Sequence, residues 1–305
     1  MRHGQYRFIV GFLVVPLALY AVFVISPFVQ AFYYSMTNWT GVSPQFEVVG
    51  LANFKALLHD SLFLRAVRNN AVLLVVMPLA VILAALFYAF LLNVGGGGGG
   101  TGVGVRGVRG SGFYKLVFFL PQVLSVPVIA VIWAVILDPT PTGLANSVLR
   151  GIGLGSTGWL ADPNLALYCV LWVLVWGSVG FYLVLFNAAM SSIPKDLFEA
   201  ALIDGAGRVA TFFRVTMPLL WDTIQTSWVY LAVLALDVYA LVAVMTAGPG
   251  GPANSTQVIS LQIAQNGFEF GRAGYASAMG VVLFFFTLII AAIMLRATRR
   301  ERIEY

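Results

Sequence analysis

Apolar residues dominate six stretches of this chain, and polar residues gather in the segments between them. Each stretch reaches the ~20 residues that an α-helix needs to cross a bilayer. The first stretch is too long, and too weakly flanked by small residues, for a cleaved signal peptide. The pattern predicts an all-α polytopic membrane protein with six transmembrane helices, at about Phe8–Tyr33, Asn69–Asn93, Phe113–Leu137, Leu165–Met190, Pro218–Val244 and Gly274–Leu295.

Several features interrupt this pattern. Before the second span, GLANFKALL carries apolar residues at helical spacing, which indicates a short interfacial helix. After that span, the run Gly95–Gly100 begins a glycine-rich segment that cannot hold a regular helix and is predicted to be a flexible cytoplasmic loop. Pro121 and Pro127 lie inside the third span, where prolines often mark bends beside a pathway.

The composition excludes an ordinary soluble domain, because 60% of the residues are hydrophobic and 10% are charged, against about 25% charged in soluble proteins. The single cysteine, Cys169, lies within an apolar stretch, and His3 and His59 are far apart. These residues offer neither a disulfide framework nor a metal or nucleophile site, so we expect no metal, no cofactor and no catalytic residue in the chain.

Charge sets the expected orientation. The chain carries 17 Lys and Arg, and with both ends inside, twelve of them lie in cytoplasmic segments and five outside. This bias follows the positive-inside rule and predicts cytoplasmic N and C termini in the cell membrane. The basic residues sit in short loops, so the high pI of 9.4 indicates membrane topology and not nucleic-acid binding.

A polar segment of 20 residues, Glu199–Pro218, separates the fourth and fifth spans. Its residue types predict a short helix, a glycine turn and a second short helix. Ser191 and Ser192 are expected to cap the first helix, and Gly205 is expected to end it in the left-handed conformation. The orientation places this hairpin in the cytoplasm, where a nucleotide-driven partner can reach it.

Asp237 is the most costly residue in the predicted spans, since an acid there costs on the order of 3 kcal/mol on insertion scales. It lies in the outer half of the fifth span. Two interpretations stay open: a carboxylate that lines a cavity and binds substrate hydroxyls, or a structural hydrogen bond to a neighbouring helix or to the outer interface.

The fourth span carries a second group of candidates. Rings can hold the C–H faces of sugars while polar groups bind the hydroxyls, so an aromatic and polar stripe is compatible with a sugar path. Helix packing or an interfacial aromatic belt explains the same residues. The substrate-path candidates are therefore Trp172, Trp176, Ser178, Tyr182 and Asp237.

The polar hairpin resembles the cytoplasmic EAA motif of permease subunits from binding-protein-dependent carbohydrate ABC importers. The matching positions are Glu199, Ala200, Ala201, Asp204, Gly205, Ala206, Phe212 and Pro218. SPFVQAFYYSMTNW, FFLPQVLSVPVIAVIWAVILDPTPTGLAN and TAGPGGPANSTQVISLQIAQ resemble the same family, in its maltose- and glycerol-phosphate-type first permease. The long glycine loop departs from the tight connection that the family usually has there.

The resemblance implies a type I ABC importer permease fold, with an N-terminal helix and outer loop in residues 1–65, a permease domain in 66–297 and a cytoplasmic tail in 298–305. It implies three partners besides membrane lipid: a second permease subunit, an ABC ATPase dimer that binds ATP-Mg, and an extracytoplasmic solute-binding protein. The helix Pro194–Ile203 would dock on the ATPase, with Glu199 contacting a basic residue. Gly205 would permit the turn without a side-chain clash, and Asp204 would hydrogen-bond the start of the second helix. The outer segments Asn38–Phe54 and Gly248–Phe270 would receive the binding protein.

The expected activity is translocation of a sugar into the cytoplasm, with no chemistry in this chain. Candidate substrates are di- and oligosaccharides, N-acetylated sugars and glycerophosphodiesters. A neutral sugar is favoured because no basic residue lies deep within a span; Lys115 is at the cytoplasmic end of the third span. Two alternatives are an ion-gradient-driven secondary transporter, which needs coupling acids and usually repeats, and an intramembrane enzyme, which needs a catalytic constellation. The chain shows one deep acid, no obvious repeat and no such constellation.

Overall fold

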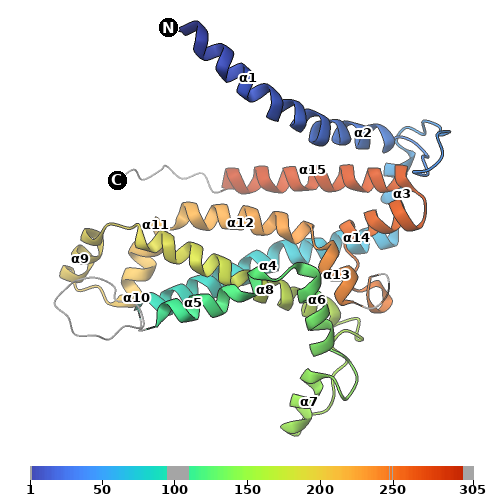
Figure 1. Ribbon diagram of the computed structural model, residues 1–305. Helices are drawn as coiled ribbons and strands as arrows, with labels where there is room; N and C mark the ends of the chain where they lie inside the picture. The colour runs from blue at the N-terminus through green and yellow to red at the C-terminus, as the bar shows by residue number, and fades with distance from the viewer. Residues whose placement is uncertain (1, 95–109, 247, 249, 298–305) are drawn as a thin grey trace. The chain divides into compact units, whose positions relative to one another are not determined.

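A computed structural model of the protein describes residues 2–94, 110–246, 248 and 250–297 (Figure 1). Across these residues the structure is helical, and the one β-type pairing is an isolated antiparallel bridge between Thr37 and Val48. The expected all-α class is confirmed. The glycine run Gly95–Gly100 and the tail 298–305 lie outside the described residues.

The chain divides into two compact units. The first comprises Met1–Leu64 with Gln262–Phe286, and the second Arg65–Leu261 with Thr287–Tyr305. The helical elements that begin in the first unit are α1 (Arg2–Tyr20), the π-helix η1 (Ala21–Ile25), α2 (Ser26–Tyr34), α3 (Ala52–Leu57), α4 (Ser61–Val94), the π-helix η5 (Gln265–Glu269) and α15 (Ala273–Ala297).

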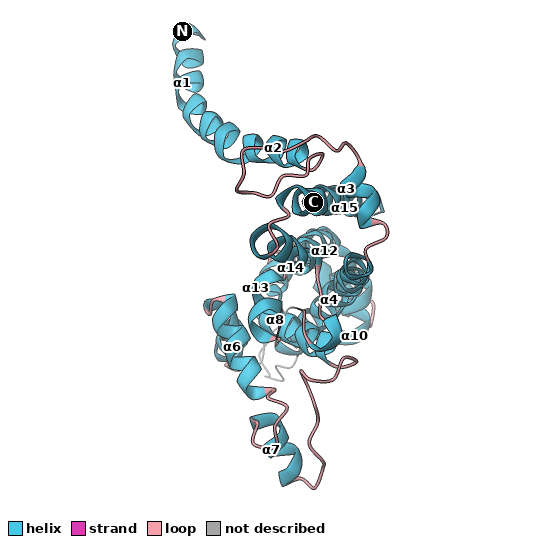
Figure 2. Ribbon diagram, turned by 90° about the vertical axis from the view of Figure 1, so that its right-hand side faces the viewer, coloured by secondary structure: helices cyan, strands magenta, loops and turns pink. Residues whose placement is uncertain are grey.

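The second unit holds the remaining elements: α5 (Ser111–Phe119), the 3-10 helix η2 (Leu120–Val123), α6 (Val126–Ile136), α7 (Leu144–Gly151), α8 (Ala166–Ser191), α9 (Lys195–Ile203), α10 (Arg208–Thr211), the π-helix η3 (Phe212–Thr216), α11 (Met217–Leu219), α12 (Trp221–Leu236), α13 (Tyr239–Met245), the 3-10 helix η4 (Pro252–Asn254) and α14 (Ile259–Ala264). Parts of α4 and α15 also belong to this unit. Figure 2 looks down its helices, with α4, α8, α12 and α13 around one another.

Four described helices are long and apolar enough to cross a membrane: Gly11–Tyr34, Ser61–Leu92, Ala166–Ser191 and Ala273–Met294. The predicted third and fifth spans are not single straight helices. Ser111–Val123 and Val126–Ile136 meet at a bend of 100°, and Arg208–Leu219 and Trp221–Leu236 meet at 67°. The structure therefore has four continuous candidate spans, or up to six if each bent pair is one span.

The bend in the third candidate span follows from its prolines. Pro121 lies in the 3-10 turn η2, and Leu124 and Ser125 are extended, with ψ near 142° and 148°. Pro127 occupies the first turn of α6, where a missing N–H costs nothing. Proline cannot supply the N–H that a continuous helix requires, so the chain ends one helix and begins another.

The second candidate span begins earlier than the expected Asn69, because Asp60 starts the helix. One oxygen of its carboxylate, Oδ1, accepts hydrogen bonds from the N–H groups of Leu62 and Phe63, at 2.9 and 3.2 Å. Its Oδ2 accepts a hydrogen bond from Tyr275 Oη at 2.8 Å. The short interfacial helix expected just before it is present as α3, with Leu57 fully buried.

The core of the second unit is built from apolar side chains of α4, α8, α12 and α13, among which Phe186 and Leu183 are fully buried. Helix α5 packs on α8 at a backbone contact. A Cβ atom added at Gly180 would lie 1.8 Å from the carbonyl oxygen of Phe118, so no other residue fits there without moving a backbone. Close by, Gln122 Nε2 donates to the carbonyl of Gly177 at 2.6 Å.

The segment between α6 and α8 is ordered by one buried side chain. Asn146, on α7, donates to four backbone carbonyls, including those of Asp138 and Thr157, and its Oδ1 accepts from Thr157 N–H and Trp159 Nε1. Hydrogen bonds from the hydroxyl and the N–H of Thr140 hold the pKa of the Asp138 carboxyl below its ordinary value. This segment is a folded structure and not an unstructured linker.

The contact between α5 and α8 predicts opposite outcomes for two glycines one turn apart. Gly180→Ala should lower the free energy of unfolding by about 1–3 kcal/mol, the range for overpacking a close contact. Gly177→Ala should be neutral or slightly stabilising, because nothing lies within 4 Å of the added Cβ and alanine favours a helix. Thermal unfolding midpoints of the purified proteins in detergent measure both. Equal midpoints for the two variants would contradict the contact.

Candidate functional site

The hairpin expected between the fourth and fifth spans is formed by α9, the turn at Gly205, α10 and η3. Gly205 has φ +74°, which confirms the predicted left-handed residue. The N–H of Ala206 donates to the carbonyl of Ala201 at 2.9 Å, and the N–H of Gly205 donates to that of Leu202 at 3.0 Å. This pair of bonds is the Schellman motif, which satisfies carbonyls that a helix end otherwise leaves free.

The glycine is required for its conformation and not for space. A Cβ atom at Gly205 would have no neighbour within 4 Å. The clash that glycine avoids in this turn is therefore between a Cβ and the residue's own backbone, and not with another segment. The positive φ is the constraint, because it costs most L-residues about 1–2 kcal/mol.

The serines before α9 do not cap it as expected. Ser191 Oγ donates to the carbonyl of Asn187, and Ser192 Oγ donates to that of Ala189, so both hydroxyls belong to the end of α8. The N-cap position of α9 is Pro194, which makes no side-chain cap bond. Serine bonds to a carbonyl three or four residues back compete with capping.

The hairpin is fixed to the second unit by its aromatic and small residues. Phe212 is buried and lies against Phe90 of α4, with ring centroids 4.8 Å apart. Ala201 is also buried and Ala206 is half-buried. Pro218 is exposed in α11, just before the 67° bend. Phe212 and Ala201 thus serve packing, and they leave other motif residues at the surface.

One face of α9 is exposed, and it combines charge with an apolar residue. Glu199, Ala200 and Asp196 are exposed, and the side chain of Ile203 is 86% exposed. These positions are spaced as one helical stripe. A large aliphatic side chain so exposed beside acids is typical of a contact surface, although a single one carries little weight.

Asp204 is the C-cap residue of α9 and is exposed. Its expected bond to the second helix is not present among the described residues: Gly207 occupies the N-cap of α10, with no side-chain cap bond. Asp204 therefore belongs to the exposed part of the hairpin.

The aromatic and polar stripe expected on α8 is divided by the structure. Trp172 is 59% exposed and Trp176 36%, whereas Ser178 and Tyr182 are buried in the helix packing. Trp176 meets Trp133 of α6 edge-to-face, at 5.3 Å between centroids. The indole N–H of Trp133 has no hydrogen-bond partner among the described residues. Trp133 and Trp176 form the aromatic pair that the structure brings together, and Trp172 lies four residues before Trp176 on α8.

Asp237 lies at a break in the fifth candidate span, and not inside a continuous helix as expected. It follows the last residue of α12 with φ −107° and ψ 65°, and α13 begins two residues later. Its side chain is exposed, and its N–H donates to the carbonyl of Leu234 at 3.2 Å. Irregular backbone at membrane depth is tolerated where it is buried in protein or lines a water-filled cavity.

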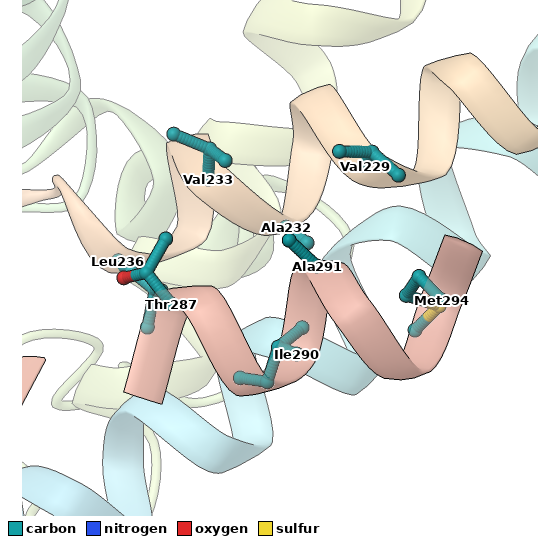
Figure 3. Close-up of a pocket in the computed structure, with 8 residues that line it drawn as sticks. All are labelled: Val229, Ala232, Val233, Leu236, Thr287, Ile290, Ala291 and Met294. Atoms are coloured by element: carbon teal, nitrogen blue, oxygen red, sulfur yellow. The ribbon is translucent and has the colours of Figure 1, made fainter. Parts of the chain in front are cut away.

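A pocket between α12 and α15 is apolar and holds no candidate (Figure 3). Ala232 and Ala291 face each other there, and the other labelled side chains surround them. Small residues allow such a close approach of membrane helices. Among the described residues no group of three His, Cys, Asp or Glu is placed to hold a metal. Cys169 is buried, and its thiol contacts the carbonyl of Trp159.

The comparisons with known proteins decide the family. Residues 49–303 match the family model of the binding-protein-dependent transport system inner membrane component. The chain belongs to this family. It is therefore an inner-membrane permease component of an ABC transporter, located in the cell membrane as a multi-pass protein.

Relatives of this permease are transport proteins. The chain is 43% identical to the diacetylchitobiose uptake system permease protein NgcF of Streptomyces coelicolor over 302 residues, covering 98% of this chain and 84% of that one. It is 30% identical to the multiple sugar-binding transport system permease protein MsmF of Streptococcus mutans, over 95% of this chain and 94% of that one. A bacterial transporter that imports the polysaccharide alginate has the same fold, with a TM-score of 0.81, 22% identity and 97% and 96% coverage.

Sequence reasoning missed the buried asparagines of this permease. Asn69, Asn70 and Asn146 are buried, and each bonds several backbone groups of another segment. The sequence signal for these residues is the free-energy cost of burying an amide: a carboxamide at the edge of an apolar run needs hydrogen-bond partners. Asn69 and Asn70 stand at the start of the second predicted span, where a buried amide predicts partners on another segment.

The turn at Gly205 predicts a difference between two substitutions. Asparagine tolerates the left-handed region, whereas the β-branched valine does not. In Gly205→Val the backbone amides at positions 205 and 206 should exchange hydrogen with solvent roughly 5–30-fold faster. This factor corresponds to a loss of about 1–2 kcal/mol in the stability of the turn. Gly205→Asn should exchange at nearly the native rate. Hydrogen exchange read by mass spectrometry on the peptide spanning α9 measures this, and equal rates in the two variants would refute the conformational role.

Proposed function

We propose that this permease conducts a carbohydrate into the cytoplasm and is driven by an ATPase that docks on α9. The observation that carries the proposal is the rigid hairpin: α9 is ended by a Schellman turn, is anchored through Phe212, and presents Glu199, Ala200 and Ile203 to solvent. A helix fixed at its C-terminal end can transmit a push or pull to the helices that follow it. ATP binding would then switch the spans by rigid-body motion between inward- and outward-facing states.

The proposed assembly has six spans, with both termini and α9 in the cytoplasm. In this arrangement each bent pair of helices forms one span. The partners are a second permease subunit, an ATPase pair that binds ATP-Mg, and an extracytoplasmic solute-binding protein that meets Asn38–Phe54 and Gly248–Phe270. The family description, a component of binding-protein-dependent transport, supports a solute-binding partner. The same membership disfavours an ion-gradient-driven carrier.

The proposed substrate is a neutral amino-sugar disaccharide or a related oligosaccharide. The relative with 43% identity is named for diacetylchitobiose uptake. Helices α8, α12 and α13 contain no Lys or Arg that would pair with a phosphate. We place the path at the exposed indoles of Trp172 and Trp176 and at the carboxylate of Asp237. The buried Ser178 and Tyr182 would act behind it, by packing.

Uptake energetics test the function. The assay follows uptake of radiolabelled N,N′-diacetylchitobiose by cells that express the whole importer. Uptake should stop when ATP is depleted while the proton gradient is maintained. It should continue when an ionophore collapses the gradient but ATP remains. The opposite pattern would contradict the proposal. In the same assay Asp237→Asn should raise the half-saturating sugar concentration if the carboxylate contacts substrate, and a lower amount of membrane protein alone would assign it a structural role.

A further inference from the structure

Two adjacent asparagines lie near the start of the long apolar helix α4. The side chain of Asn70 is fully buried and that of Asn69 is 7% exposed. A carboxamide taken out of water costs free energy unless hydrogen bonds replace those it loses. Both asparagines find their partners on segments more than 160 residues away in sequence.

Asn70 joins the ends of two other helices. Its Nδ2 donates to the carbonyl of Ala235 at 3.2 Å, and its Oδ1 accepts the N–H of Ile259 at 2.8 Å. Ala235 lies in the last turn of α12, and Ile259 is the first residue of α14. The last carbonyls and first N–H groups of a helix lack partners within it. One side chain therefore satisfies a free acceptor at one helix end and a free donor at another.

Asn69 holds the Gly/Pro segment that precedes α14. Its Nδ2 donates to the carbonyls of Ser255 and Gln257, both at 2.8 Å. One turn earlier on α4, the Arg65 guanidinium donates to the carbonyl of Ala253. Ala253 itself has φ +50°, a strained conformation for alanine. The outer segment is thus fastened to one face of α4 at successive turns.

The segment is also tightly packed within itself. Thr256 Oγ1 and Thr246 Oγ1 lie 3.2 Å apart and both residues are buried. A Cβ at Gly250 would lie 2.3 Å from Gln257 Oε1, so the backbone approaches its own side chains closely. These contacts join the outer segment to the end of α13 and to itself, and its bonds to Asn69 would carry a displacement of the segment to α4.

We infer that Asn69 and Asn70, here called the asparagine clamp, link the outer segment to the helix break that carries Asp237. Asp237 is two residues beyond Ala235, which Asn70 holds. The bonds of 2.8 and 3.2 Å are lost beyond about 3.5 Å. A shift of the outer segment by about 1 Å therefore either moves the break or ruptures the clamp. Asn69 and Asn70 are positioning residues, and the coupling rests on the proposed function, in which a solute receptor contacts the outer segment.

The test separates the two halves of the clamp. Asn70→Leu keeps the side-chain size and removes both bonds. Asn70→Asp keeps the acceptor for Ile259 N–H and removes the donor to Ala235. Thr246→Val is the matched control, because it removes a buried hydrogen bond between the end of α13 and the outer segment and leaves α4 untouched. Each variant is assembled in lipid nanodiscs with the second permease and the ATPase, and is compared with the native importer.

Two readouts are taken. Hydrogen exchange should rise about tenfold or more in both peptides 233–242 and 256–262 for Asn70→Leu, and mainly in 233–242 for Asn70→Asp. The second readout is the ratio of two ATPase rates, one with the receptor saturated by N,N′-diacetylchitobiose and one without receptor. This ratio should fall at least fivefold in Asn70→Leu. It should stay within twofold of native in Thr246→Val. A mere loss of stability would lower both rates together and leave the ratio unchanged.

The outcomes divide cleanly. Native exchange in both peptides, or a native ATPase ratio, in Asn70→Leu would overturn the clamp. If Asn70→Leu does not assemble, Asn69→Leu decides: a lowered ratio supports the coupling and a native ratio overturns it. A native importer whose ATPase ignores the loaded receptor would refute the proposed function, and the exchange of the two peptides would still decide whether the clamp exists.

Discussion

A polar backbone group inside an apolar environment needs a partner, and most of this structure follows from that requirement. A continuous helix satisfies it automatically, which is why four candidate spans are unbroken. Where a helix breaks, the free groups need side chains from elsewhere. Asn70 supplies a donor to the last turn of α12, near Asp237, and an acceptor to the first residue of α14. The buried amides of Asn69 and Asn70 are thus found where backbone groups of other segments need partners.

The same requirement separates the rigid from the exposed parts of the hairpin. The Schellman bonds close the carbonyl end of α9, and Phe212 fixes the following turn against Phe90. The helix surface that remains free carries Glu199 and a strongly exposed Ile203. In the proposed importer that surface meets the ATPase, and the stiffness behind it allows the spans to move as bodies. At the outer end, the asparagine clamp would couple the outer segment to the helix break at Asp237 in the same way.

Much of this was accessible from the sequence, and the failures have physical causes. Hydropathy gave the helical class and the position of each apolar stretch, and Gly205 was predicted because a left-handed residue favours glycine. Hydropathy carries no information on helix direction, so it predicted neither bend. Pro121 and Pro127 indicated the 100° bend in the third span, and no residue pattern was recognised for the 67° bend in the fifth. The face of α8 on which Tyr182 lies depends on which helices pack there, and that information is not local. The partners of Asn69 and Asn70 are equally distant.

The central claim is that α9 touches an ATPase, and cross-linking at Ile203 tests it most directly. A photoreactive amino acid placed at Ile203 in cells that express the whole importer should yield, on illumination, a covalent adduct with the ATPase subunit. The same group at Ile152, which is 69% exposed in the segment after α7, should yield none with that subunit. An ATPase adduct from Ile203 that is absent from Ile152 is the predicted result, and equal or absent adducts at both positions would contradict the account.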